Sequence, residues 1–110
     1  MEEYEASANR MPVLSPDEER TLAVAAQAGD QHAYKCLVES NLRLVLAIAK
    51  TKAADPDELT RLVGAGNLGL VRAIHKFAPD HEYRFATYAT WWIRQAISKQ
   101  QADDDRSPPA

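Results

Sequence analysis

Apolar residues recur at spacings of three and four along most of the chain, whereas a strict alternation of apolar and polar residues is rare. The first spacing is that of one face of an α-helix, and the second would indicate a strand. Start and stop signals divide the apolar pattern into about four stretches. The pattern therefore predicts an all-α protein, a compact single-domain bundle of about four helices.

The first two helices are predicted from their caps. Ser15 stands before Pro16 with Glu18 three residues after it, a combination typical of a capping box at a helix start. Gly29 is expected to end this helix. Asp30 caps the second helix, which is predicted to continue without a break through the apolar stretch 42–49.

The third helix begins at Asp55 and Pro56, and its apolar positions keep the helical period as far as residue 77. Its interior holds Gly64, Gly66 and Gly69, each of which costs about 1 kcal/mol relative to alanine. These glycines indicate either a close approach of another helix or a locally weak helix.

The fourth helix is expected at roughly 86–102, after a loop that contains Pro79. The helical domain is therefore assigned to residues 15–102. Residues 1–14 show no period and are predicted to be a flexible segment. Residues 103–110 are acidic and proline-rich, and are predicted to be a disordered tail.

Composition narrows the classes of function. The single cysteine, Cys36, excludes an internal disulfide and a cysteine-based zinc site, and no acid, histidine and nucleophile pattern indicates an enzyme. We expect no metal, no cofactor, no membrane span and a cytoplasmic location. The net charge is −3, but residues 66–102 carry five bases against two acids. Any attraction to nucleic acid is therefore expected from this section.

That basic section also holds the aromatic residues: five of the chain's eight lie within 83–97. On a helix, one side would carry a set spaced by three and four residues, namely Thr87, Tyr88, Trp91, Trp92 and Gln95. Adjacent residues on a helix point about 100° apart, so the two tryptophans cannot both face inward. Such a surface suits unstacked nucleotides, and it suits a protein partner equally; an oligomer contact is a third, less favoured interpretation.

Several segments resemble a known family. "LVESNLRLVLAIAK" (37–50), "GNLGLVRAIHKF" (66–77) and "YRFATYATWWIRQAI" (83–97) together resemble the second conserved region of primary-type bacterial RNA polymerase sigma factors. "SPDEERTLAVAAQAGDQHA" (15–33) resembles the short segment that precedes this region. The resemblance spans about 4–106, and the family's later promoter-reading domains have no counterpart in it. It implies a transcription-initiation protein that recognises and melts the promoter −10 element by capturing the non-template strand.

The resemblance also implies roles for individual residues. Tyr88 would stack on the first adenine flipped from the duplex, and Trp91 and Trp92 would form a wedge at the upstream edge of the bubble. Gln95, Ser98 and Lys99 would face the last intact base pair. The remaining implied DNA-binding residues line the strand path or hold a second flipped base: Tyr83, Arg84, Phe85, Thr87, Asn41 and Leu44.

In this family the third helix docks onto the coiled-coil clamp of the largest subunit of core RNA polymerase, through an Asp-Leu-Ile-Gln-Glu-Gly sequence. Here residues 61–66 read Arg-Leu-Val-Gly-Ala-Gly. The positions implied for docking are Arg61, Leu62, Val63, Gly64, Ala65, Asn67 and Leu70. The altered stretch supports an alternative: a truncated regulatory remnant that has lost normal polymerase docking and binds DNA or protein, including an anti-sigma protein.

Overall fold

The computed structural model of the protein describes residues 14–78 and 84–106. Within these two ranges the chain forms five helices and no strand. In chain order they are α2 (Pro16–Gln27), α3 (Gln31–Ser40), α4 (Leu42–Lys52), α5 (Pro56–Lys76) and α6 (Phe85–Arg106). The predicted all-α bundle is confirmed.

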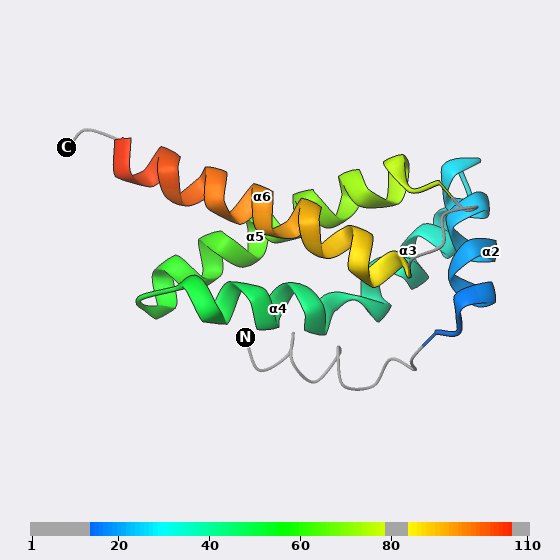
Figure 1. Ribbon diagram of the computed structural model, residues 1–110, viewed down its shortest axis with the longest axis horizontal. Helices are drawn as coiled ribbons and strands as arrows, with labels where there is room; N and C mark the ends of the chain where they lie inside the picture. The colour runs from blue at the N-terminus through cyan, green and yellow to red at the C-terminus, as the bar shows by residue number, and fades with distance from the viewer. Residues whose placement is uncertain (1–13, 79–83, 107–110) are drawn as a thin grey trace.

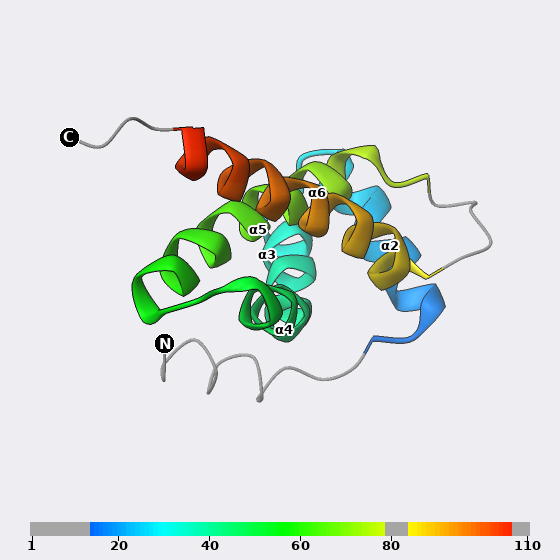
Figure 2. The same ribbon diagram turned by 60° about the vertical axis from the view of Figure 1, so that its left-hand side comes forward.

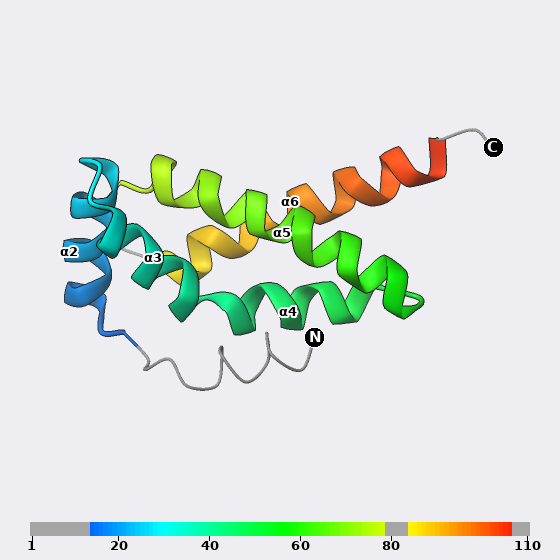
Figure 3. The ribbon, with the colours of Figure 1, turned by 180° about the vertical axis from the view of Figure 1, so that it is seen from behind.

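Helices α5 and α6 are the longest and lie against each other along the molecule, with α4 beside both (Figure 1). Helices α2 and α3 pack together at the end where α6 begins (Figures 1 and 3). Turning the molecule shows α4 and α6 on different sides of α5 (Figure 2). Helices α4 and α6, which carry predicted DNA-binding residues, therefore both pack against α5, the central helix of the bundle.

The predicted helix starts are confirmed. Ser15 Oγ accepts from the Glu18 amide, and the Glu18 carboxylate accepts from the Ser15 amide, which completes the capping box of α2. Asp55 caps α5 in the same way, although the Glu58 carboxylate accepts from Ala54 instead of the cap residue. Gly29, with φ of +102°, follows the end of α2 in the left-handed region that favours glycine.

The prediction of one continuous second helix is wrong, because the chain breaks at Asn41. The backbone there has φ −113° and ψ 10°, and it separates α3 from α4. Asn41 Nδ2 donates to the Leu37 carbonyl at 2.8 Å, and Ser40 Oγ donates to the Cys36 carbonyl. Side chains that bond back to carbonyls four residues earlier compete with the helical hydrogen bonds and bend or end a helix.

Helix α6 continues beyond the predicted end at 102 as far as Arg106. Asp104, assigned from the sequence to a disordered tail, accepts from Gln100 at 2.9 Å and from Arg61 of α5 at 3.3 Å. These contacts hold the last turn of α6 against α5. The predictions for 1–13, for the loop at 79–83 and for 107–110 lie outside the described residues.

The three glycines of α5 have different surroundings. A Cβ at Gly69 would lie 2.6 Å from the Trp92 carbonyl oxygen, and one at Gly66 would lie 2.8 Å from Val45 Cγ1, so both positions allow a close helix approach. At Gly64 a Cβ would meet nothing within 4 Å. The close approach predicted from the glycines is confirmed at Gly66 and Gly69 only. Among the described residues, we find no helix with the length and apolar character required to span a membrane.

Candidate nucleic-acid interface

Helix α6 has one buried side and one exposed side. Phe85, Ala89, Ile93 and Ile97 follow one another every four residues and are buried in the core. The opposite side carries exposed residues of several kinds, namely Arg84, Thr87, Trp91, Gln95 and Ser98. The core side fixes the rotation of α6, and this rotation presents the predicted nucleic-acid face to solvent.

The two tryptophans are treated differently, as the sequence predicted. Trp91 is 54% exposed, whereas Trp92 is partly buried and packs against the core. The backbone of Trp92 also lies over Gly69, so this residue is held by α5 from below. Trp91 is therefore the exposed ring, and its neighbour anchors the turn that carries it.

Tyr88 lies between these tryptophans and the core. Its ring centroid is 5.6 Å from that of Phe77 and 6.2 Å from those of Trp91 and Trp92. Its hydroxyl donates to the Lys76 carbonyl, at the end of α5, at 3.2 Å. Tilted and edge-to-face contacts at these distances are favourable and fix the ring orientations. The three rings thus form a surface that exists before any ligand binds.

One predicted DNA-binding residue, Phe85, belongs to the core instead. Its exposed fraction is 1%, and its ring packs edge-on against Phe77 at 5.2 Å. The ring is therefore covered by the core in this structure, and its role in lining the strand path stays a prediction. The spacing of Phe85 with Ala89 and Ile93 was the signal for burial. Tyr83 lies outside the described residues.

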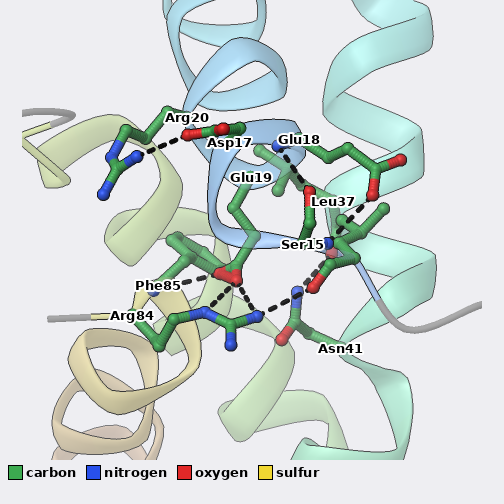
Figure 4. Close-up of polar contacts among 10 residues, drawn as sticks. Ser15, Asp17, Glu18, Glu19, Arg20, Leu37, Asn41, Arg84 and Phe85 are labelled. Atoms are coloured by element: carbon green, nitrogen blue, oxygen red, sulfur yellow. Dashed lines mark hydrogen bonds and ion pairs between the residues drawn. The ribbon is translucent and has the colours of Figure 1, made fainter.

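Arg84 is the first residue of the exposed side, and its guanidinium is turned toward α2 (Figure 4). Arg84 Nε donates to Glu19 at 2.6 Å, and Nη2 of the same side chain donates to the Leu14 carbonyl at 2.8 Å. Sequence reasoning did not single out Glu19. The available signal was its register: Glu19 stands four and seven residues before Ala23 and Ala26, on the buried side of α2.

The two candidates from the second predicted helix lie at the break between α3 and α4. Asn41 is 9% exposed, and its Nδ2 is already engaged by the Leu37 carbonyl. Leu44 is partly buried against the core. The Asn41 side chain therefore stabilises the helix break. A base could bond only to the Asn41 Oδ1 or to the second hydrogen of Nδ2.

Gln95, Ser98 and Lys99 are all exposed. Ser98 and Arg94 line a groove of about 470 Å³ between α6 and α4, whose other side holds Lys52 and Thr51. Lys99 borders a smaller hollow of about 140 Å³ toward α5. The sequence prediction included Lys99 but left Arg94 and Lys52 out of the DNA-binding residues, although Arg94 follows Trp91 at a helical spacing of three.

Several residues predicted for polymerase docking are core residues. Leu62, Val63 and Leu70 are buried. Ala65 is buried and Asn67 partly buried, so neither offers much surface. The residues of this stretch are thus mainly the inner side of α5, and their part in docking stays a prediction.

The outer side of α5 in the same stretch is different. Arg61 and Gly64 are exposed, and Arg61 Nε lies 3.3 Å from Asp104 of α6. Leu68, which sequence reasoning did not select, is 63% exposed on the following turn. Its spacing of four from Gly64 places it on the same face, and this spacing was the available signal.

Comparison with known proteins agrees with the geometry. Residues 37–107 match the family Sigma-70 region 2, and residues 7–32 match Sigma-70 factor, region 1.2. "RNA polymerase sigma factor SigA" of Clostridium acetobutylicum is 45% identical over 104 residues, which cover 94% of this chain and 28% of the relative. SigA proteins of a Bacillus species and of Lactococcus lactis subsp. cremoris are 43% and 42% identical over 94% of this chain.

The fold and these matches define a helical domain of the region 2 type, preceded by a region 1.2 segment. The chain belongs to the sigma-70 family. It spans 28–29% of the length of these three relatives.

Proposed function

We propose that this chain acts in transcription initiation as a sigma-factor domain that binds the non-template strand of the promoter −10 element. The observation that carries the proposal is the exposed indole of Trp91 beside the fixed ring of Tyr88 on the outer side of α6. The family membership supports the same function, because the relatives are RNA polymerase sigma factors.

The energetics are consistent with strand capture. Taking a base out of a duplex costs a few kcal/mol, and stacking on an aromatic side chain returns about 1–3 kcal/mol per base. Because the Tyr88 ring is already held by three neighbouring rings, little order has to be imposed when a base arrives. Binding alone would then favour the opened strand, and no chemical step is required, so we propose that the protein is not an enzyme.

Residues beside the rings would read and hold the strand. Gln95 can donate to and accept from a base edge, and Thr87 and Ser98 offer hydroxyl groups on the same side. Lys99 and Arg94 supply positive charge for phosphates. Asn41 and Leu44 remain candidates for a second flipped base, within the limits that the bond from Asn41 to Leu37 sets.

A comparison of two exposed apolar side chains tests the proposal. Trp91→Ala should weaken binding to a fluorescent −10 non-template strand by about 5- to 150-fold, the equivalent of one lost stacking contact. Val24→Ala is the matched control, because Val24 is also 54% exposed but lies on α2. It should leave binding unchanged. Fluorescence anisotropy with the complementary strand completes the assay, and equal affinity for both strands would refute base reading.

We further propose that the outer side of α5 docks onto the clamp coiled coil of the largest polymerase subunit. Arg61, Gly64 and Leu68 provide the accessible positions. An exposed leucine flanked by a cation is the kind of residue that a partner helix covers.

A second candidate function is a regulatory remnant without normal docking, which would hold the promoter strand or an anti-sigma protein. The ion pair between Arg61 and Asp104 favours this candidate, since the Arg61 charge on the outer side of α5 is already paired within the chain. A pull-down with core polymerase separates the two. Under the second candidate, a variant with Arg61→Asp and Gly64→Gln, at the two exposed positions of the altered stretch, should bind more tightly than the wild type. That variant also needs Asp104→Asn, to avoid two facing carboxylates.

A further inference from the structure

Glu19 is one of two buried polar residues among the described residues. Its partners are Arg84, just before α6, and Phe85, the first residue of α6. Its carboxylate accepts from Arg84 Nε at 2.6 Å, from Arg84 Nη2, and from the Phe85 amide at 3.1 Å (Figure 4). The pair joins residues 65 positions apart in the chain. A buried carboxylate is costly unless it is paired and hydrogen-bonded, and this one has both kinds of partner.

The contact with the Phe85 amide replaces a helix cap. The first amides of a helix have no acceptor within the helix, and a side-chain oxygen normally supplies one. Here the acceptor comes from α2, which also places a negative charge at the positive end of the helix dipole of α6. Helix α2 therefore fixes where the aromatic helix begins.

The contact with Arg84 changes the charge of the strand-facing side. Tyr88, Trp91 and Gln95 lie in one row along α6, and Arg84, the residue just before the helix, stands four positions before the first of them. A free arginine at the head of this row would attract phosphate. In the structure Arg84 is paired with the buried Glu19 carboxylate, its Nη2 also donates to the Leu14 carbonyl, and 48% of its side chain stays exposed.

We propose that Glu19 is a positioning residue that withholds Arg84 from nucleic-acid phosphate and caps α6, so that strand binding depends on the rings and not on this cation. The inference deepens the proposed function and rests on it for the identity of the ligand. It makes Arg84 a structural residue instead of a direct strand contact.

The slope of binding affinity against salt concentration tests the proposal. Each phosphate that a protein neutralises on a single strand adds about 0.7 to the slope of log K against log salt. Binding of the whole chain to fluorescent oligo-dT, which carries no −10 sequence, is measured between about 50 and 200 mM salt. Glu19→Gln should steepen the slope by about 0.7, a roughly threefold larger loss of affinity over that range.

Two further variants complete a cycle. Arg84→Met should leave the wild-type slope unchanged, because Arg84 is not in contact with phosphate. The double variant Glu19→Gln with Arg84→Met should also show the wild-type slope. It removes both charges, so it can replace the single Arg84 variant if the unpaired buried Glu19 prevents that variant from folding. A shallower slope for either Met variant than for the wild type would overturn the proposal, as would an unchanged slope for Glu19→Gln.

Amide hydrogen exchange gives a readout that is independent of DNA. The Phe85 amide should exchange faster in Glu19→Gln than in the wild type, whereas amides in the middle of α6 should not change. Equal exchange at Phe85 would contradict the capping role. If the wild type shows no preference for the non-template strand, the proposed function fails, yet the salt slopes on oligo-dT and the exchange data still decide the role of Glu19.

Discussion

The same substitution at three positions of α5 should give three different stabilities. Glycine to alanine in the middle of a helix gains about 1 kcal/mol from helix propensity alone. At Gly64 nothing lies within 4 Å of the added methyl group, so Gly64→Ala should keep this full gain. Its midpoint of thermal unfolding should rise by about 4–8 °C.

At Gly69 the methyl group meets the backbone of α6. The added Cβ would lie 2.6 Å from the Trp92 carbonyl oxygen and 3.0 Å from Ile93 Cα, well inside ordinary van der Waals contact. Backbone atoms cannot rotate away, so the two helices must move apart. Overpacking of this kind costs about 1–3 kcal/mol or more, and we expect Gly69→Ala to lose about 2 kcal/mol overall. The displaced turn carries Trp92, so affinity for the non-template strand should fall as well.

Gly66 is the intermediate case. Its nearest neighbour is a methyl group of Val45 at 2.8 Å, at the end of a side chain that can adjust. Gly66→Ala should therefore be close to neutral, with the propensity gain offset by local repacking.

Urea and thermal unfolding followed by circular dichroism measure the series. The gap between the Gly64 and Gly69 variants should be about 3 kcal/mol, or about 12–24 °C in the unfolding midpoint. If all three variants were stabilised alike, helix propensity alone would govern α5, and the close approach of α6 would not exist.

Three further predictions concern contacts between or at the ends of helices. Gln27 Nε2 donates to two carbonyls at the end of α5, at 2.9 and 2.6 Å, so Gln27→Glu should destabilise the fold by about 1–3 kcal/mol in urea unfolding, and a neutral result would show these bonds to be unimportant. The Ser15 amide, and after it the Ser15 hydroxyl, hold the pKa of Glu18 below its ordinary value, so stability should fall as the pH drops through and below that value. Ser15→Ala should lose about 1 kcal/mol at neutral pH but keep most of this acid dependence, because the amide remains; no loss of stability in thermal unfolding would argue against the capping box. Arg61 and Asp104 form a partly exposed ion pair, so Arg61→Ala should cost less than about 1 kcal/mol, and a larger loss in thermal unfolding would mean that α6 depends on this pair.

Local signals were sufficient to predict most helix starts. Ser15, Asp55 and Gly29 act within a few residues of their own positions, and the structure places all three as expected. The helix break at Asn41 was missed because it does not follow the apolar period: the Asn41 side chain competes for a carbonyl of the preceding turn. The apolar period continues through the break, so the period alone could not reveal where the helix ends.

The candidate site was predicted less evenly. The exposure of one tryptophan followed from helix geometry and is confirmed at Trp91. Phe85 was placed in the strand path by the family resemblance alone, whereas its register with Ala89 and Ile93 indicates burial, and its exposed fraction is 1%. The link between Glu19 and Arg84 joins distant parts of the chain, and only the packing of α2 against α6 brings them together.

The close packing of α5 on α6 has a mechanical consequence. Gly69 brings the backbone of one helix against that of the other, so we expect the two helices to move together. A macromolecule that binds the outer side of α5 would therefore also orient the rings of α6, because the two helices pack directly against each other. The orientation of the aromatic residues of α6 relative to such a partner would then be fixed as soon as the partner binds α5.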